Sequence, residues 1–239
     1  YIFLFTLLLL FSVELVGIFG KGAERWIKIF GVSLQPSEII KIGIIVSLAK
    51  YYHKIKFEKI GHLIYLFAPL LLVGFPFLLV VFQPDLGTAI SIFLLGTIMM
   101  FISGVRIWKF IAGICLTLIS VPFLWNNIKV YQQNRILSFL NPESDPLGQG
   151  YQLIQSKIAL GSGGATGKGF LQGSQSYLEY LPEKQTDFIF TLIGEEFGFL
   201  GTIFLLLMFL MIILICFYIS IKSFHLYGRI LSLGIASNF

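Results

Sequence analysis

The chain has 239 residues, of which 56% are apolar and only 12% are charged, and its mean hydropathy is +0.88. Soluble domains carry about 25% charged residues, so this composition excludes a water-soluble enzyme, a disordered tail and a disulfide-rich secreted scaffold. It indicates an integral membrane protein that crosses the bilayer several times. The net charge of +5 fits the basic loops of such a protein, and no nucleic-acid partner is expected.

Long apolar blocks recur along the chain and predict an all-α, polytopic membrane protein. Continuous apolar runs, rather than alternation with period two, favour helices over a barrel. We expect six to seven spans within a single transmembrane domain covering residues 1–239. The six clear spans are residues 1–19, 38–52, 63–82, 86–104, 110–125 and 188–221, and a seventh begins near Ile230. Both ends of the chain lie in apolar runs, so we expect an interior fragment of a longer protein.

The distribution of Lys and Arg predicts the orientation. The loops at residues 50–62, 106–109 and 222–229 hold eight of these residues, whereas those at 20–35 and 83–85 hold three and none. Basic loops stay in the cytoplasm. The long loop 126–187 is therefore expected on the outer face. A loop of this length is typical of a binding or catalytic element, and Tyr151, Ile154 and Ile158 in it share one helical face.

The segment GSGGATGKG at residues 161–169 looks like a phosphate loop but fails the nucleotide pattern, because Ser162 and Gly169 stand where Gly and Ser or Thr are required. It also lies on the side without ATP. Two interpretations remain open, a flexible turn and a weak anion contact made by Lys168 together with backbone N–H groups. Arg135, in the same outer loop, is a second candidate anion contact.

Three acidic residues lie at the start of the last long span. Asp187 falls in the first turn, where the positive end of a helix favours its charge. It is either a plain helix-start carboxylate or a functional one at the membrane boundary. Glu195 and Glu196 lie deeper, where charges are expensive and usually functional or paired; neutral, protonated glutamates are the alternative. Helical geometry places Glu195 about 80° from Asp187 and Glu196 about 180° from it, so we expect Glu195 to border the Asp187 site.

Two further motifs mainly predict helix boundaries. QPDLGTAI at residues 83–90 predicts a tight helical hairpin, with Asp85 as the cap of the following helix. Near Pro36 a helix should begin, and Glu38 and Lys41 at i, i+3 can pair. No cluster has metal-ligand spacing, so the metal ligands stay unknown.

Together these motifs resemble the SEDS family of bacterial morphogenesis proteins, the RodA, FtsW and SpoVE group, most closely RodA. The resemblance is carried by several long motifs in matching order. They are KGAERWI at 21–27, QPSEIIK at 35–41, QPDLGTAI at 83–90, NPESDPLGQGYQLIQSKIALGSGG at 141–164, GKGFLQGSQSYLEYLPE at 167–183 and TDFIFTLIGEEFG at 186–198. Gln185 departs from the family, whose members commonly have His there.

The resemblance implies a multi-pass protein of the bacterial inner membrane that acts as a peptidoglycan glycosyltransferase during cell elongation and shape maintenance. Its substrate would be lipid II, the undecaprenyl-pyrophosphate-linked disaccharide pentapeptide, and its partner a class B penicillin-binding protein. The family's essential acidic residue falls on Asp187, which fits a general base for the acceptor hydroxyl. The substrate's pyrophosphate needs charge neutralisation, by a divalent cation (Mg or Mn) or basic side chains, and no organic cofactor is expected. A lipid-linked sugar flippase and a non-catalytic scaffold for a penicillin-binding protein stay open as alternatives.

Overall fold

The computed structural model describes residues 1–16, 18–20, 23–29, 32–83, 85–125, 133, 137, 141, 149–174 and 188–239. The described residues divide into two compact units, one formed by residues 1–114 and 212–239, the other by residues 115–211. Helices α5 (Ile107–Trp125) and α9 (Ile189–Lys222) each run from one unit into the other. The prediction of a single domain over residues 1–239 therefore stays a prediction.

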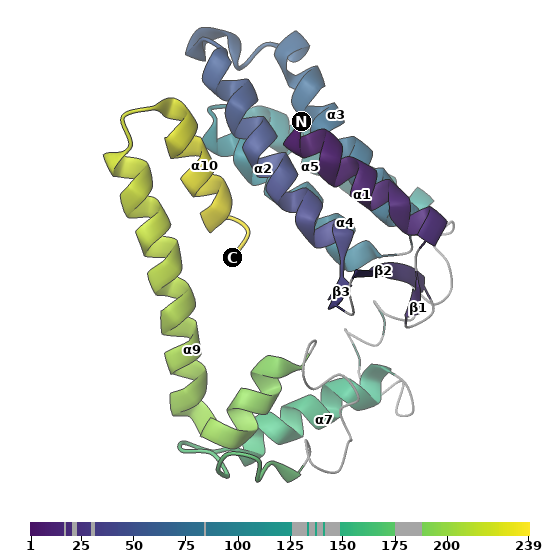
Figure 1. Ribbon diagram of the computed structural model, residues 1–239, viewed down its shortest axis with the longest axis vertical. Helices are drawn as coiled ribbons and strands as arrows, with labels where there is room; N and C mark the ends of the chain where they lie inside the picture. Colours follow the sequence, from purple (N-terminus) through teal and green to yellow (C-terminus); the bar gives the residue numbers. More distant parts are fainter. Residues whose placement is uncertain are drawn as a thin grey trace. The chain divides into compact units, whose positions relative to one another are not determined.

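The first unit is a bundle of helices built around α2. Its helices are α1 (Ile2–Val16), α2 (Pro36–Lys54), α3 (Leu63–Phe82), α4 (Leu86–Ile102), the start of α5, the end of α9 and α10 (Leu226–Ala236), with a short 3-10 turn at Phe57–Lys59. Helix α2 lies between α1 and α10 in Figure 1 and contacts both of them as well as α3 and α4.

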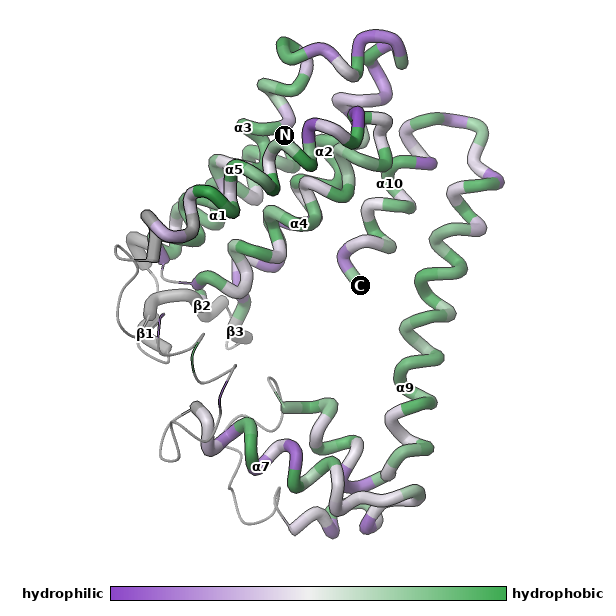
Figure 2. Tube along the Cα trace, turned by 180° about the vertical axis from the view of Figure 1, so that it is seen from behind, coloured by the Kyte–Doolittle hydropathy of each residue, from purple (hydrophilic) through white to green (hydrophobic). Residues whose placement is uncertain are grey.

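The core of this unit follows from the spacing of apolar residues on α2. Ile40, Ile44 and Leu48 recur every fourth residue, share one helical face and are fully buried. They form one cluster with Leu10 of α1 and Met99 of α4, among others. Figure 2 shows apolar residues along α3, α4, α5 and α9, and hydrophilic residues gathered in the connections.

Helical polytopic architecture is confirmed, and several predicted spans agree closely with observed helices. Helix α3 has the bounds predicted for the third span, and α10 includes Ile230. Two described helices, α3 and α9, are long and apolar enough to cross a membrane by themselves, and shorter apolar stretches occur in α1, α4, α5 and α10. The predicted start at Pro36 is also confirmed, because α2 begins there.

The first span was predicted to reach Phe19, which is wrong. Helix α1 ends at Val16, and three short antiparallel strands follow in the order β1 (Ile18–Gly20), β2 (Ala23–Ile29), β3 (Val32–Leu34). In the second pairing Ile27 lies opposite Leu34. β-branched and aromatic residues, which favour strands, are frequent here, and an apolar strand next to an apolar helix is indistinguishable from its continuation by hydropathy.

The second unit contains the end of α5, helix α7 (Gln149–Ser162) and the first part of α9. Helix α7 confirms that part of the long loop 126–187 is helical. Its buried positions include Ser156 and Ala159, whereas Ile158 is 46% exposed. The apolar face suggested by Tyr151, Ile154 and Ile158 is thus not the one that packs most tightly.

Candidate active site

Helix α9 is broken near the acidic residues. Gly198 has φ 65° and ψ −160°, which is not helical, so α9 consists of a first segment, residues 189–197, and a second segment, residues 199–222. A break leaves the last carbonyl groups of the first segment and the first N–H groups of the second without partners inside the helix. At membrane depth such groups must be satisfied by protein.

The glycine loop, residues 161–169, supplies the missing partners for both segments, beginning with donors for the carbonyl groups of the first. The N–H groups of Lys168 and Gly169 donate to the carbonyl oxygens of Glu195 and Glu196 at 3.0 and 2.9 Å. Two donors that the predicted anion contact required are therefore used within the protein.

The same loop also binds the second segment, but here the loop accepts the hydrogen bonds and the helix donates them. The N–H of Phe199 donates to the Gly164 carbonyl at 2.9 Å, and the N–H of Leu200 donates to the Ala165 carbonyl at 3.1 Å. Four main-chain hydrogen bonds thus join the loop to the two ends of the break. We call this arrangement, residues 163–169, residues 194–200 and Ser174, the α9 joint.

Glycine is required where the two backbones meet. A Cβ at Gly198 would collide with the backbone of residues 165 and 167, and its positive φ also disfavours other residues. A Cβ at Gly167, whose φ is +81°, would collide with the carbonyl of Glu196. The main chains therefore approach as closely as two strands do.

An ion pair lies within the joint. Lys168 Nζ is 2.8 Å from Glu195 Oε1, and the side chain of Glu195 is 0% exposed while that of Lys168 is 27% exposed. Ser174 completes the cluster: Lys168 Nζ donates to its Oγ at 2.7 Å, and this Oγ donates to Glu195 Oε1 at 3.3 Å. A carboxylate buried this deeply needs such partners to keep its charge.

The predicted site residues are only partly within the described chain. The structure brings Lys168 and Glu195 together, which their sequence positions did not indicate. Glu196 is also buried, at 5% exposure. Asp187 and Arg135 lie outside the described residues, so their predicted roles stay predictions. Asp187 precedes the start of α9 by two positions in the sequence.

The motifs at residues 83–90 and near Pro36 form the expected helix cap and the expected ion pair. Asp85 caps α4 by accepting from the Thr88 N–H at 3.4 Å and from the Thr88 hydroxyl at 2.9 Å, and it also accepts from Gln35 Nε2 at 3.3 Å. Glu38 and Lys41 pair at 2.7 Å. Both predictions are confirmed.

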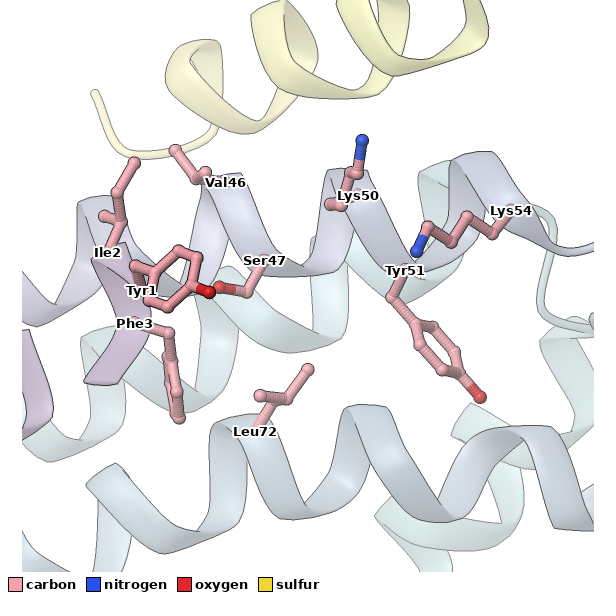
Figure 3. A pocket seen from close by; sticks show the side chains of 9 residues that line it. All are labelled: Tyr1, Ile2, Phe3, Val46, Ser47, Lys50, Tyr51, Lys54 and Leu72. Atoms are coloured by element: carbon pink, nitrogen blue, oxygen red, sulfur yellow. The ribbon is translucent and has the colours of Figure 1, made fainter. Parts of the chain in front are cut away.

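The described cavities differ in chemistry from the joint. One of about 440 Å³ lies among α1, α2 and α3 and is lined mainly by apolar side chains, with Lys50, Tyr51 and Lys54 (Figure 3). Lys50 points away toward α10, where its Nζ is 6.0 Å from the Tyr227 ring centre. A smaller cavity of about 190 Å³ is lined by Gly194 and Gly198 of the joint and by Thr202, among others. In the described part of the chain no three His, Cys, Asp or Glu side chains gather as metal ligands would.

Sequence reasoning missed the break in α9 and the part played by Ser174. One signal for the break was present, because the predicted span was longer than a bilayer needs and contained Gly194, Gly198 and Gly201. Nothing in the sequence pointed to Ser174.

This architecture defines a class of polytopic helical membrane proteins with a known fold. RodA of Thermus thermophilus, a rod shape determining protein, shares it with a TM-score of 0.63 at 22% identity, over 99% of this chain and 60% of that one. A solved structure described as a peptidoglycan synthase complex that coordinates polymerization and crosslinking matches with a TM-score of 0.80 at 31% identity, over 99% and 65%.

The family follows from the sequence match. The model of the FtsW, RodA and SpoVE family, described as cell cycle proteins, matches residues 1–239, and the chain belongs to that family. It is 40% identical over 244 residues to the peptidoglycan glycosyltransferase MrdB of Escherichia coli strain K12, covering 98% of this chain and 63% of that relative. It is 41% identical to the probable peptidoglycan glycosyltransferase FtsW of Trichlorobacter lovleyi, covering 97% and 61%. The chain thus spans less than two thirds of these curated relatives.

Proposed function

We propose that the chain is part of a peptidoglycan glycosyltransferase that polymerises lipid II into glycan strands during cell elongation and shape maintenance. The observation that carries this proposal is the 40% identity, over 98% of the chain, to a relative named as a peptidoglycan glycosyltransferase. The polar joint in the second unit supports it, because it is built a few residues after the acidic position that the motifs assign to catalysis.

In the proposed reaction Asp187 is the general base. It takes the proton of the acceptor sugar's 4-hydroxyl, whose oxygen attacks the anomeric carbon of the donor. The bond from that carbon to the lipid pyrophosphate breaks, and the pyrophosphate leaves with the electron pair. A single displacement inverts the anomeric configuration, so one catalytic carboxylate suffices where glycoside hydrolases need two.

The leaving pyrophosphate requires positive charge. Of the two basic candidates in the outer loop, Arg135 is the proposed contact, and a divalent cation is a further means of neutralising the pyrophosphate. Lys168 already pairs with Glu195 in the described structure. The described residues form no carboxylate or histidine cluster for a cation, so no step is assigned to one.

The proposed location is the bacterial inner membrane, which the chain crosses several times with residues 126–187 on the outer face. This side fits a substrate whose lipid lies in the bilayer and whose sugars lie in the outer headgroup layer. The proposed partner is a class B penicillin-binding protein. It is supported by the solved synthase complex, whose description couples polymerization with crosslinking.

The test is polymerisation of lipid II by the purified full-length protein and by its Asp187→Asn variant. Asparagine keeps the size and much of the hydrogen bonding but has no basicity at neutral pH. The wild type should make glycan strands, and the variant should make none while inserting into membranes normally. Near-normal strand synthesis by Asp187→Asn would remove the catalytic role of this residue, and an inactive wild type would remove the proposed function.

A further inference from the structure

The Lys168–Glu195 ion pair joins segments that are also linked through their main chains. Lys168 donates its backbone N–H to the Glu195 carbonyl at 3.0 Å and its ammonium to the Glu195 carboxylate at 2.8 Å. The two residues are 27 positions apart in sequence. Sliding the glycine loop by one residue along α9 would separate the ammonium from the carboxylate. The pair therefore specifies one register between loop and helix.

Stability alone does not account for this pair. A well-packed apolar pair of similar volume is often as stabilising as a buried ion pair. The four main-chain hydrogen bonds already join the loop to the break. What the charges add is selection of one arrangement, since any other separates the fully buried Glu195 carboxylate from the Lys168 ammonium.

The first segment of α9 connects this arrangement to the proposed chemistry. Residues 189–197 form a short helix that begins two positions after Asp187 and ends at the joint. The glycine loop binds the carbonyl oxygens of Glu195 and Glu196 at the end of this segment, so the joint constrains its orientation. Displacements of about 1 Å from a productive geometry can lower turnover by about 100-fold.

We propose that Lys168 and Glu195 are positioning residues: their ion pair locks the α9 joint and thereby sets the orientation of residues 189–197, the helical segment that begins two positions after the proposed base Asp187 in the sequence. This inference rests on the proposed function. It differs from direct contact of Lys168 with the substrate pyrophosphate, because a positioning pair loses turnover when either Lys168 or Glu195 is replaced, whereas a pyrophosphate contact needs Lys168 but not Glu195.

The test compares lysine variants of the full-length protein in steady-state lipid II polymerisation. Lys168→Met should lower kcat about tenfold or more and leave KM within about twofold. Lys168→Arg keeps the charge and should retain most of the turnover. Lys157→Met, at an exposed lysine of α7 in the same unit, is the matched control and should behave as wild type. The pH at which the acid limb of the rate profile is half-maximal should not move in Lys168→Met, because Asp187 remains the titrating base.

A double variant separates positioning from folding. Lys168→Met with Glu195→Gln removes both charges of the pair, so it should fold even where Lys168→Met does not, and its kcat should stay low. Full recovery of kcat in this folded double variant would show that the pair only prevents a buried unpaired charge, and would overturn the proposal. A raised KM with unchanged kcat in Lys168→Met would overturn it in favour of a substrate contact.

Different results would contradict the proposed function and the positioning role. An inactive wild type, or an active Asp187→Asn variant, contradicts the glycosyltransferase mechanism whatever Lys168 does. An active wild type and an inactive Asp187→Asn variant, combined with a Lys168→Met variant indistinguishable from Lys157→Met, contradict the positioning role alone.

Discussion

Each of the two units of the chain is stabilised internally by a different kind of contact. The first unit packs helices through apolar side chains such as Ile44, Leu48 and Ile92, which are fully buried. The α9 joint of the second unit is instead built from main-chain hydrogen bonds, closely approaching glycines and a buried ion pair. Apolar packing tolerates substitutions that conserve volume, whereas a polar joint with fixed partners does not. The apolar core of the first unit is therefore suited to stabilising the fold, and the α9 joint is suited to holding its side chains and helix ends in one fixed position.

The largest effect is expected at the joint glycine. Gly198→Ala should destabilise the protein by about 4 kcal/mol, of which about 1–3 comes from the strained φ and about 1–3 from the collision with residues 165 and 167. Gly74→Ala on α3 is the control, because a Cβ there meets no atom within 4 Å, and its effect should stay within about 1 kcal/mol. Equal thermal shifts for the two variants would mean that the break does not need glycine.

A smaller effect is expected in the apolar core of the first unit. Leu48→Ala should cost about 2–3 kcal/mol, because it leaves a cavity among buried side chains. Ile42→Ala on the same helix, at a side chain that is 57% exposed, should change the free energy of unfolding by less than about 0.5 kcal/mol. Thermal unfolding in detergent measures both. If Ile42→Ala is as damaging as Leu48→Ala, the exposed face of α2 packs against another part of the protein.

The smallest effect is expected at the cap of α4. Asp85→Ala removes the acceptor of the Thr88 N–H and hydroxyl and should cost about 1 kcal/mol. Thr97→Ala on the exposed side of the same helix, where the hydroxyl only bonds the Phe93 carbonyl, should be close to neutral. A neutral Asp85→Ala variant would contradict the capping role and leave the Gln35 contact without consequence for stability.

Hydropathy and spacing suffice for most helices of the first unit because these helices are apolar runs with polar ends. Helix α3 coincides with its prediction since His62 and Gln83 bound a continuous run of apolar residues. The Glu38–Lys41 pair could be predicted because both partners lie on one helix turn. The strands after Val16 could not, because an apolar segment such as Ile18–Gly20 satisfies helix and strand equally.

The joint could be predicted only in part, because its contacts depend on how the glycine loop folds back on α9. The position of Glu195 within a span predicts that its carboxylate needs a proton, a cation or a basic partner. Its partner Lys168 lies 27 residues earlier in a loop that resembled an anion site. Hydropathy cannot predict the non-helical backbone at Gly198, because a break in an apolar helix changes the backbone angles and leaves the composition unchanged.

The measurement that tests this account most directly is turnover per folded molecule, set against melting temperature, for Lys168→Met and Leu48→Ala side by side. Leu48→Ala should melt at a lower temperature and polymerise lipid II at the wild-type rate per folded molecule. Lys168→Met should lose about tenfold or more in kcat, beyond anything its melting temperature explains. If both variants fall on one line of turnover against stability, the joint contributes only to folding and the division of roles between the two units is contradicted.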